Sequence, residues 1–470
     1  MKINISHIFV VSGLAVLAIF GQSCTHSHAG PNDHDHPHGH HHEDAEFTVP
    51  ELKNRGVALG SNQEMDMIQG RYESAKATYA ENKTSVDALI DLTQVFITEG
   101  RITGDQHYYA DAALATIAQV KHNEIATTDQ QFQALWLEST VLMTMHQFAK
   151  AKKVATKAVM LNPYNAAVYG VLVDANVELG NYTEAVEVAD KMVGIRPDLR
   201  SYSRISYLRE IHGDAEGAIE AMKMAVEAGY PGDEQRAWCR VKLGQLQETY
   251  SDLAEAEMQY LLAIQERDDY PFALNALANV KRKQGSFEEA EALAERSIAL
   301  MENAGFYEIL ADIQKDQGKD QEAAASIDKC IELLIGLNDE EHAHSHSHGT
   351  EHTHTHEVSL EMANVQLRYK NDVKKALKSV KTEYNNRPNN IDVNISYAGV
   401  LYRKGDFKDA QKHINKVLEV GSKNPDALSL AGLIQMKLGA ESGKDLIVES
   451  FQTNPYQNHA MADEAKAMIN

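Results

Sequence analysis

One spacing constrains the fold of this chain more than any other feature: a Gly-x-x-x-x-Ala element recurs at nearly constant intervals. The alanines that share its frame are separated by 34, 33, 38, 34, 33, 53 and 34 residues, and five of them follow the glycine. These positions are Ala151, Ala185, Ala218, Ala256, Ala290, Ala323, Ala376 and Ala410. A repeat of roughly 20 to 50 residues indicates a solenoid, in which each unit buries its apolar face on its neighbours.

The details of one unit resemble the tetratricopeptide repeat family, whose period is about 34 residues. Tyr169 occupies the aromatic position of the first helix, Gly180 ends that helix, and Pro197 closes the unit 34 residues after Pro163. Val173 departs from the pattern, because the family usually has a small residue there. The resemblance implies an all-α fold, an α-solenoid of helix-turn-helix repeats, with a concave groove that binds peptides or proteins.

We expect this solenoid to occupy 61–337 and 358–470, with nine or ten units in all. The stretch Met65–Asn82 has the pattern of a lone second helix. Ser85–Lys121 is a divergent repeat, with the extra residues 103–107 predicted to lie between its two helices.

The 53-residue interval exceeds one period by about 19 residues, which is close to the length of the segment 338–357. We therefore predict that this segment is a loop inserted between two repeats, a position that often serves binding. It carries seven histidines, namely His342, His344, His346, His348, His352, His354 and His356.

The first 23 residues have the pattern of an export signal. Lys2 precedes an apolar run, Ile8–Phe20, which is too short to span a bilayer as an ordinary helix. The residues that end at Cys24 resemble a bacterial lipobox, with Gly21 where leucine is usual. The resemblance implies lipid attachment at Cys24 and a place in the cell envelope, on the outer membrane or a periplasm-facing membrane of a Gram-negative-type bacterium. Plain secretion and a buried N-terminal helix remain alternatives.

A second group of histidines lies on the predicted flexible tether, 24–60. It comprises His26, His28, His34, His36, His38, His40, His41 and His42. Together the two tracts hold fifteen of the 22 histidines of the chain, and neutral imidazole binds Zn, Ni, Co and Cu. No fixed set of four ligands stands out, so we expect several exchanging sites for a divalent metal ion. The alternatives are a solvated linker and a pH sensor.

Polar and aromatic residues of the repeats suggest a surface for a partner. Asn275, Asn279 and Lys283 are spaced i, i+4, i+8 and share one helix face, while Tyr207 and Trp238 are aromatic candidates in neighbouring units. Asparagine amides can donate to and accept from an extended peptide backbone. The expected partner is a protein or peptide, with a metal transporter as one candidate, and the alternative is a solvated helix face.

Charge and motifs exclude several classes. The net charge of −23 argues against binding nucleic acid or an anionic membrane surface, so membrane contact is expected through the lipid anchor only. No nucleophile elbow, phosphate-binding loop or metalloprotease motif occurs, and we predict no enzyme. Cys239 and Cys330 fall in different repeats and are expected to be unpaired.

Three functions remain after these exclusions. The first is a metal-handling envelope lipoprotein, in which the histidine tracts bind metal for homeostasis or delivery and the solenoid docks a partner. The alternative is a scaffold for protein–protein interaction in envelope assembly, without a metal role. The third is an enzyme or regulatory subunit whose site the sequence does not reveal.

Overall fold

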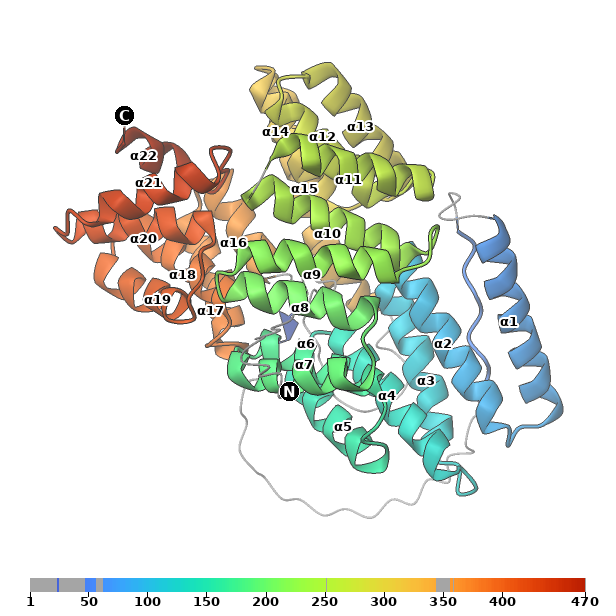
Figure 1. Cartoon of the computed structure of the whole chain (residues 1–470). Coiled ribbons are helices and arrows are strands. Elements are labelled where there is room, and N and C mark those ends of the chain that lie inside the picture. The colour runs from blue at the N-terminus through green and yellow to red at the C-terminus, as the bar shows by residue number, and fades with distance from the viewer. Residues whose placement is uncertain are drawn as a thin grey trace, which may run out of the picture.

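The computed structural model describes residues 23–24, 47–55, 62–250, 252–343, 356–357 and 359–469 (Figure 1). Within these ranges all regular secondary structure is helical, apart from one antiparallel pair of two-residue strands. The strands are β1 (Ser23–Cys24) and β2 (His356–Glu357). The helices are α1 (Asn62–Glu81), α2 (Val86–Thr103), α3 (Gln106–Lys121), α4 (Thr128–Thr144), α5 (Phe148–Leu161), α6 (Ala166–Glu178), α7 (Tyr182–Ile195), α8 (Leu199–Ile211), α9 (Ala215–Ala228), α10 (Glu234–Tyr250), α11 (Leu253–Glu266), α12 (Pro271–Lys283), α13 (Phe287–Leu300), α14 (Ala304–Asp316), α15 (Asp320–Ala343), α16 (Ser359–Arg368), α17 (Val373–Asn386), α18 (Ile391–Lys404), α19 (Phe407–Glu419), α20 (Pro425–Lys437), α21 (Gly443–Thr453) and α22 (Ala462–Ala467).

The helices form an α-solenoid of helix-turn-helix repeats, as predicted. In the described part of the chain, ten antiparallel pairs run from α2–α3 to α20–α21, and each helix packs on the next one along the chain. The lone helix α1 precedes the first pair and packs on α2, as the pattern of Met65–Asn82 indicates.

The small residues of the repeat fix how closely paired helices approach. Ala185, Ala218, Ala290 and Ala410 each have no exposed surface, because the first helix of the same repeat covers them. Gly180, in the turn between α6 and α7, has a φ of +74°, a left-handed conformation that a residue without Cβ adopts readily. The recurring motif therefore encodes both the turn and the helix contact of each unit.

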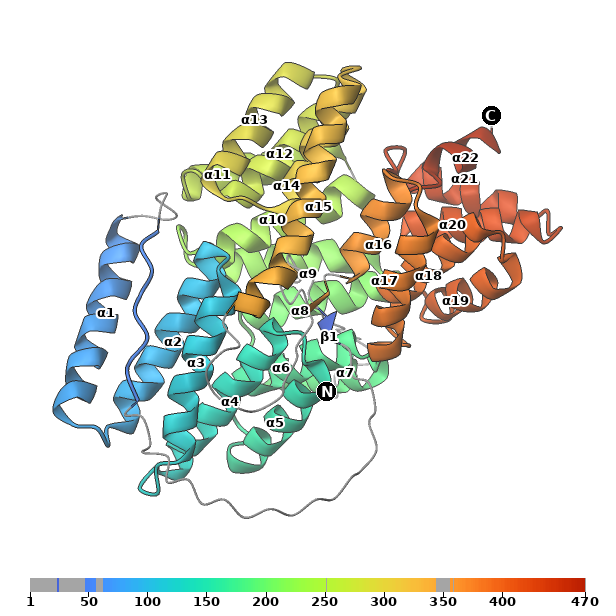
Figure 2. The ribbon, with the colours of Figure 1, turned by 180° about the vertical axis from the view of Figure 1, so that it is seen from behind.

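The C-terminal helices pack against repeats of the N-terminal half, a contact that the nearest-neighbour expectation did not include. The largest hydrophobic cluster joins buried residues of α4–α8 to residues of α16–α22. Tyr182 Oη accepts a hydrogen bond of 2.8 Å from the backbone N–H of Ile391, and His212 Nδ1 donates to the Val420 carbonyl at 3.0 Å. Figures 1 and 2 show the C-terminal helices returning to the side of α6–α9 while α11–α15 extend away. The molecule is a solenoid whose C-terminal arm closes on its N-terminal arm.

Three predicted boundaries differ from the structure. Residues 47–55, within the predicted flexible tether, pack on α1–α3, because Phe47, Val49 and Leu52 join the hydrophobic cluster there. Of the extra residues 103–107, only Gly104 and Asp105 lie between the helices, because α2 extends to Thr103 and α3 begins at Gln106. Helix α15 continues to Ala343, so the first residues of the predicted insertion, His342 among them, are helical; this stretch contains no glycine or proline.

Several predictions fall outside the described residues. These are the export signal, most of the two histidine tracts, and the side chain of Cys24, of which only the backbone is described. His342 and His356 are placed by their backbone in α15 and β2. Among the described residues, no helix is both long and apolar enough to cross a bilayer. Cys239 and Cys330 are free and buried, in agreement with the expectation of unpaired thiols.

Candidate partner-binding groove

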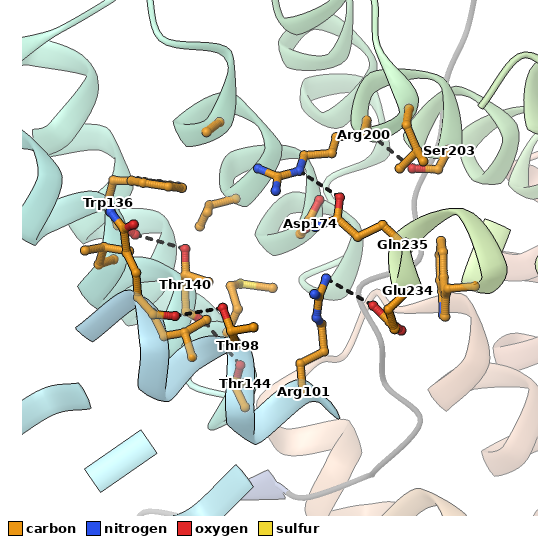
Figure 3. Close-up of a pocket in the computed structure, with 18 of the residues that line it drawn as sticks. Thr98, Arg101, Trp136, Thr140, Thr144, Asp174, Arg200, Ser203, Glu234 and Gln235 are labelled. Carbon is orange, nitrogen blue, oxygen red and sulfur yellow. Dashed lines mark hydrogen bonds and ion pairs between the residues drawn. The ribbon is translucent and has the colours of Figure 1, made fainter. Parts of the chain in front are cut away.

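The first helices of the N-terminal repeats line a hollow of about 490 Å³ on the inner side of the solenoid. Its walls come from α2, α4, α6, α8 and α10, so it spans five consecutive units. In Figure 3, Trp136 lies on the α4 wall, Arg101 reaches in from α2, and Arg200 reaches in from α8. We call this hollow the N-terminal groove.

Arginines dominate the charge of the N-terminal groove. Arg204 donates to both carboxylate oxygens of Asp174 at 2.6 Å, and Arg101 pairs with Glu234 at 3.3 Å. Arg200 has a weaker partner, because its Nε donates to the Gln235 side chain at 3.2 Å. Burial, and then the charges of Arg204 and Arg101, lower the pKa of Arg200. Among the described residues Arg200 has no carboxylate partner, so an anion beside it would relieve the crowding of positive charge.

Two tryptophans supply the apolar part of the same surface. The Trp238 side chain is only 6% exposed, and its indole N–H is buried without a hydrogen-bond acceptor in the described structure. Trp136 is partly buried on the opposite wall. A buried indole N–H usually has an acceptor, so the Trp238 N–H marks a place where a bound group could supply one.

A second hollow of about 490 Å³ lies further along the chain and contains two of the predicted partner residues. Asn275 and Asn279 line it together with Phe272 and Phe306, whose rings pack edge to face at 5.7 Å. The Asn275 side-chain oxygen is buried without a partner there.

The predicted partner residues differ in what they contact. Asn279 and Lys283 each donate to Glu248 Oε1 at 2.6 Å, so these two side chains are engaged within the solenoid. Trp238 lies in the N-terminal groove, whereas Tyr207 donates to Asp392 at 3.5 Å where the two arms meet. The structure thus brings together the asparagines and lysine but not the two aromatic residues.

The groove arginines and Trp136 were missed by the sequence reasoning, although the repeat period contains a signal for them. Positions spaced 34 residues apart from Trp136 onward occupy the same place in successive repeats, and most of them line one of the two hollows. This series comprises Trp136, Gly170, Arg204, Trp238, Phe272 and Phe306. Gly170 leaves room for its neighbour in the series, because a Cβ there would lie 3.0 Å from Cζ of Arg204. Following one position through all repeats would have located both hollows.

Family models for repeat proteins match three parts of the chain. A tetratricopeptide repeat model matches residues 142–209, a second matches 273–304, and a model of the tetratricopeptide repeat protein 21 ARM repeat matches 299–425. The chain contains tetratricopeptide repeats. This finding agrees with the register of the Gly-x-x-x-x-Ala motif and with the observed helix pairs.

Solved structures similar to this chain are also repeat proteins or pilus factors. The Pseudomonas aeruginosa PilF structure is 16% identical, with 46% of this chain and 98% of that chain covered and a TM-score of 0.38. PilW, a type IV pilus biogenesis factor, is 14% identical, with coverages of 46% and 95% and a TM-score of 0.37. A tetratricopeptide repeat protein of Parabacteroides merdae is 14% identical, with coverages of 65% and 99% and a TM-score of 0.35. No curated protein matches the chain.

The described residues contain no group of three or more His, Cys, Asp or Glu side chains that could hold a metal ion. The predicted ligands lie almost entirely outside the described ranges, so the metal hypothesis depends on the sequence alone. The two hollows are lined by arginine, tryptophan and asparagine side chains among others, which can form ion pairs and hydrogen bonds.

Proposed function

We propose that this chain is a non-enzymatic scaffold that binds a protein or peptide partner in the N-terminal groove of its tetratricopeptide solenoid. The repeats provide a rigid inner surface formed by five consecutive units. The observation that carries the proposal is the charge of this surface, where Arg200 lacks a carboxylate partner beside two other arginines.

The chemistry of the groove favours an extended segment with a carboxylate next to a large apolar side chain. A guanidinium binds a carboxylate through parallel N–H donors, and this geometry suits the free face of Arg200. Trp136 and Trp238 offer apolar area, and the Trp238 N–H can donate to a backbone carbonyl of the segment. In the second hollow, the unpartnered side-chain oxygen of Asn275 can accept a hydrogen bond from the continuation of the same segment.

An array of short synthetic peptides, probed with the full chain, tests this proposal. We expect the bound peptides to be enriched in Asp or Glu beside aromatic or aliphatic residues. Arg200→Gln should then weaken the best peptide by roughly tenfold or more, as for loss of a charged hydrogen bond. Arg296→Gln is the matched control, since Arg296 pairs with Asp269 on an exposed helix surface. Unselective binding, or equal affinity of both variants for the peptide, would contradict the proposal.

A second proposed function is metal binding, and it is supported by the density of histidine in the two tracts. We propose that the two tracts bind a divalent ion such as Zn, Ni, Co or Cu, and that lipid attachment at Cys24 holds the chain in the cell envelope. Fifteen histidines within two short segments support this idea, since neither segment has a hydrophobic pattern that would explain them. Under this proposal a metal transporter is one candidate for the partner in the groove.

A further inference from the structure

Helix α5 carries a charge opposite to that of the chain as a whole. Its fourteen residues include four lysines and no Asp or Glu, whereas the full chain has a net charge of −23. Lys150, Lys153 and Lys157 are spaced i, i+3, i+7 and exposed, so they share one outward face. Lys152 belongs to another face, because it pairs with Glu184 at 2.7 Å. The acidity of the chain is therefore not uniform over its surface.

The C-terminal end of the same helix presents large apolar side chains to solvent. Met160 is 80% exposed and Tyr164 is 83% exposed, values that describe a protruding corner rather than a wall of a cleft. The corner is ordered by its own hydrogen bonds: the Tyr164 N–H donates to Asn162 Oδ1 at 3.1 Å, and the Tyr169 hydroxyl donates to the Pro163 carbonyl at 2.9 Å.

The corner belongs to the loop that joins two repeats, and two other loops between repeats also expose an apolar residue. Ile125, one repeat earlier, is 71% exposed, and Tyr230, two repeats later, is 78% exposed. By contrast, the turns within repeats lie against the C-terminal arm, as at Gly180 and Gly213. One edge of these units is thus covered by the chain itself, and the opposite edge carries exposed apolar corners.

We propose that a basic strip, made of Lys150, Lys153, Lys157, Met160 and Tyr164, rests on an anionic lipid surface. Lysines near such a surface attract its headgroups, and side chains such as Tyr and Met insert their apolar parts at the boundary of the acyl chains. A protruding corner suits insertion between lipid headgroups better than docking of a protein, which favours complementary flat or concave surfaces. This inference is independent of the groove and of the histidine tracts.

The net charge of the chain does not oppose this contact. At physiological salt the Debye length is about 8 Å, so charges on distant repeats contribute little at the strip. Only the local face matters at that range, and α5 itself adds no carboxylate to it. The sequence prediction that an anionic membrane would repel the chain used the total charge, which averages over this helix.

Sedimentation with lipid vesicles tests the proposal. The full chain is used with Cys24→Ser, so that acylation cannot anchor it, and is mixed with vesicles of phosphatidylcholine alone or with phosphatidylglycerol added. We expect binding to the phosphatidylglycerol vesicles only, with weakening as salt is raised. The triple variant Lys150→Gln, Lys153→Gln, Lys157→Gln and the double variant Met160→Ser, Tyr164→Ser should each lose about tenfold or more in affinity. These exposed substitutions should leave the melting temperature unchanged.

The matched control is Lys374→Gln, Lys378→Gln, Lys381→Gln on α17, which removes the same charge from another lysine-rich helix. It should lose at most about threefold, through general charge alone. Absence of binding by the parent chain would overturn the proposal and leave an acidic protein as the occupant of the strip. Binding that ignores phosphatidylglycerol, or an equal loss in the α17 control, would also overturn it.

Discussion

Arg387, at the end of α17, forms an ion pair with Glu178 on α6, although 209 positions of the chain separate them. The same guanidinium donates to Glu383 at 2.6 Å and lies over the Phe148 ring, 5.4 Å from its centre. The Arg387 side chain therefore connects α17 of the C-terminal arm to α5 and α6 of the N-terminal arm. The side chains of the pair are only 11% and 12% exposed, so both charges depend on each other for solvation.

Removing this cation should open the contact between the arms. Arg387→Ala leaves Glu178 and Glu383 buried without their partner, and breaking a buried pair in this way costs about 3–5 kcal/mol. We expect the midpoint of urea unfolding to fall accordingly. Arg296→Ala is the control, because its pair with Asp269 is half exposed and should contribute less than about 1 kcal/mol. Equal effects of the two variants would show that the Arg387 contact contributes little to stability.

A glycine pair separates the conformational and steric roles of the repeat turn. Gly180 and Gly285 have similar φ values, +74° and +79°. A Cβ at Gly180 would lie 2.4 Å from the backbone of Asn389, whereas a Cβ at Gly285 would have no atom within 4 Å. Gly285→Ala should cost about 1 kcal/mol through φ alone. Gly180→Ala should cost a further 1–3 kcal/mol, about the usual effect of overpacking.

Small-angle X-ray scattering gives the second measurement for this glycine pair. Gly180→Ala should enlarge the radius of gyration because the arms can no longer approach, while Gly285→Ala should leave it unchanged. If both variants lose the same stability and keep the same dimensions, the close approach at Asn389 is not required for the closed shape.

The repeats themselves could be predicted from sequence because their information is local. Gly180 and Ala185 act within one helix pair, and the same six-residue element specifies the same turn wherever it recurs. The groove was within reach for the same reason, since a position such as Arg204 faces inward in every unit.

The closed shape could not be predicted from the same evidence. The contacts of Tyr182 with Ile391 and of His212 with Val420 depend on the small rotation that each repeat adds, summed over several units. Nothing in the motif marks these residues, and Tyr207 was read as a groove aromatic although it reaches Asp392 at this contact. The net charge is a total for the chain, so it cannot show that one helix such as α5 carries four lysines and no Asp or Glu.

Two carboxyl groups should make stability fall as pH rises. Burial raises the pKa of Glu210 to about 7 and that of Glu361 to about 7, from ordinary values of 4.5. Between pH 4.5 and about 7 the folded chain therefore binds protons that the unfolded chain has released, and stability decreases with rising pH. Glu210→Gln removes this term, so the variant should gain stability relative to the parent from pH 5 to about 8.

Glu257→Gln gives the opposite sign and serves as the control for the pH measurement. Hydrogen bonds from Lys281 and Gln284 lower the pKa of Glu257, so its ionised form stabilises the fold above pH 4.5 and this effect is lost in acid. The control variant should therefore lose stability relative to the parent as pH rises to about 4.5, and the difference should stay constant above that pH. Thermal unfolding measured between about pH 3 and 8 distinguishes the two slopes, that of Glu257 below about pH 4.5 and that of Glu210 above it, and parallel curves for all three proteins would contradict both assignments.

Replacing the tract histidines by asparagine should abolish metal binding while leaving α15 and the solenoid intact. Calorimetric titration of the parent chain with Zn or Ni at pH 7.5 should give several equivalents, and the uptake should fade at pH 5.5, below the ordinary imidazole pKa of about 6.5. The matched control replaces His107 and His122, which lie at the two ends of α3, outside both tracts, and it should bind as the parent does. Substitution is preferable to deletion because His342 is part of α15, and a deletion would shorten that helix. If the tract variant binds as much metal as the parent, or if neither binds any, the metal function fails while the groove proposal still stands, since the two rest on different residues.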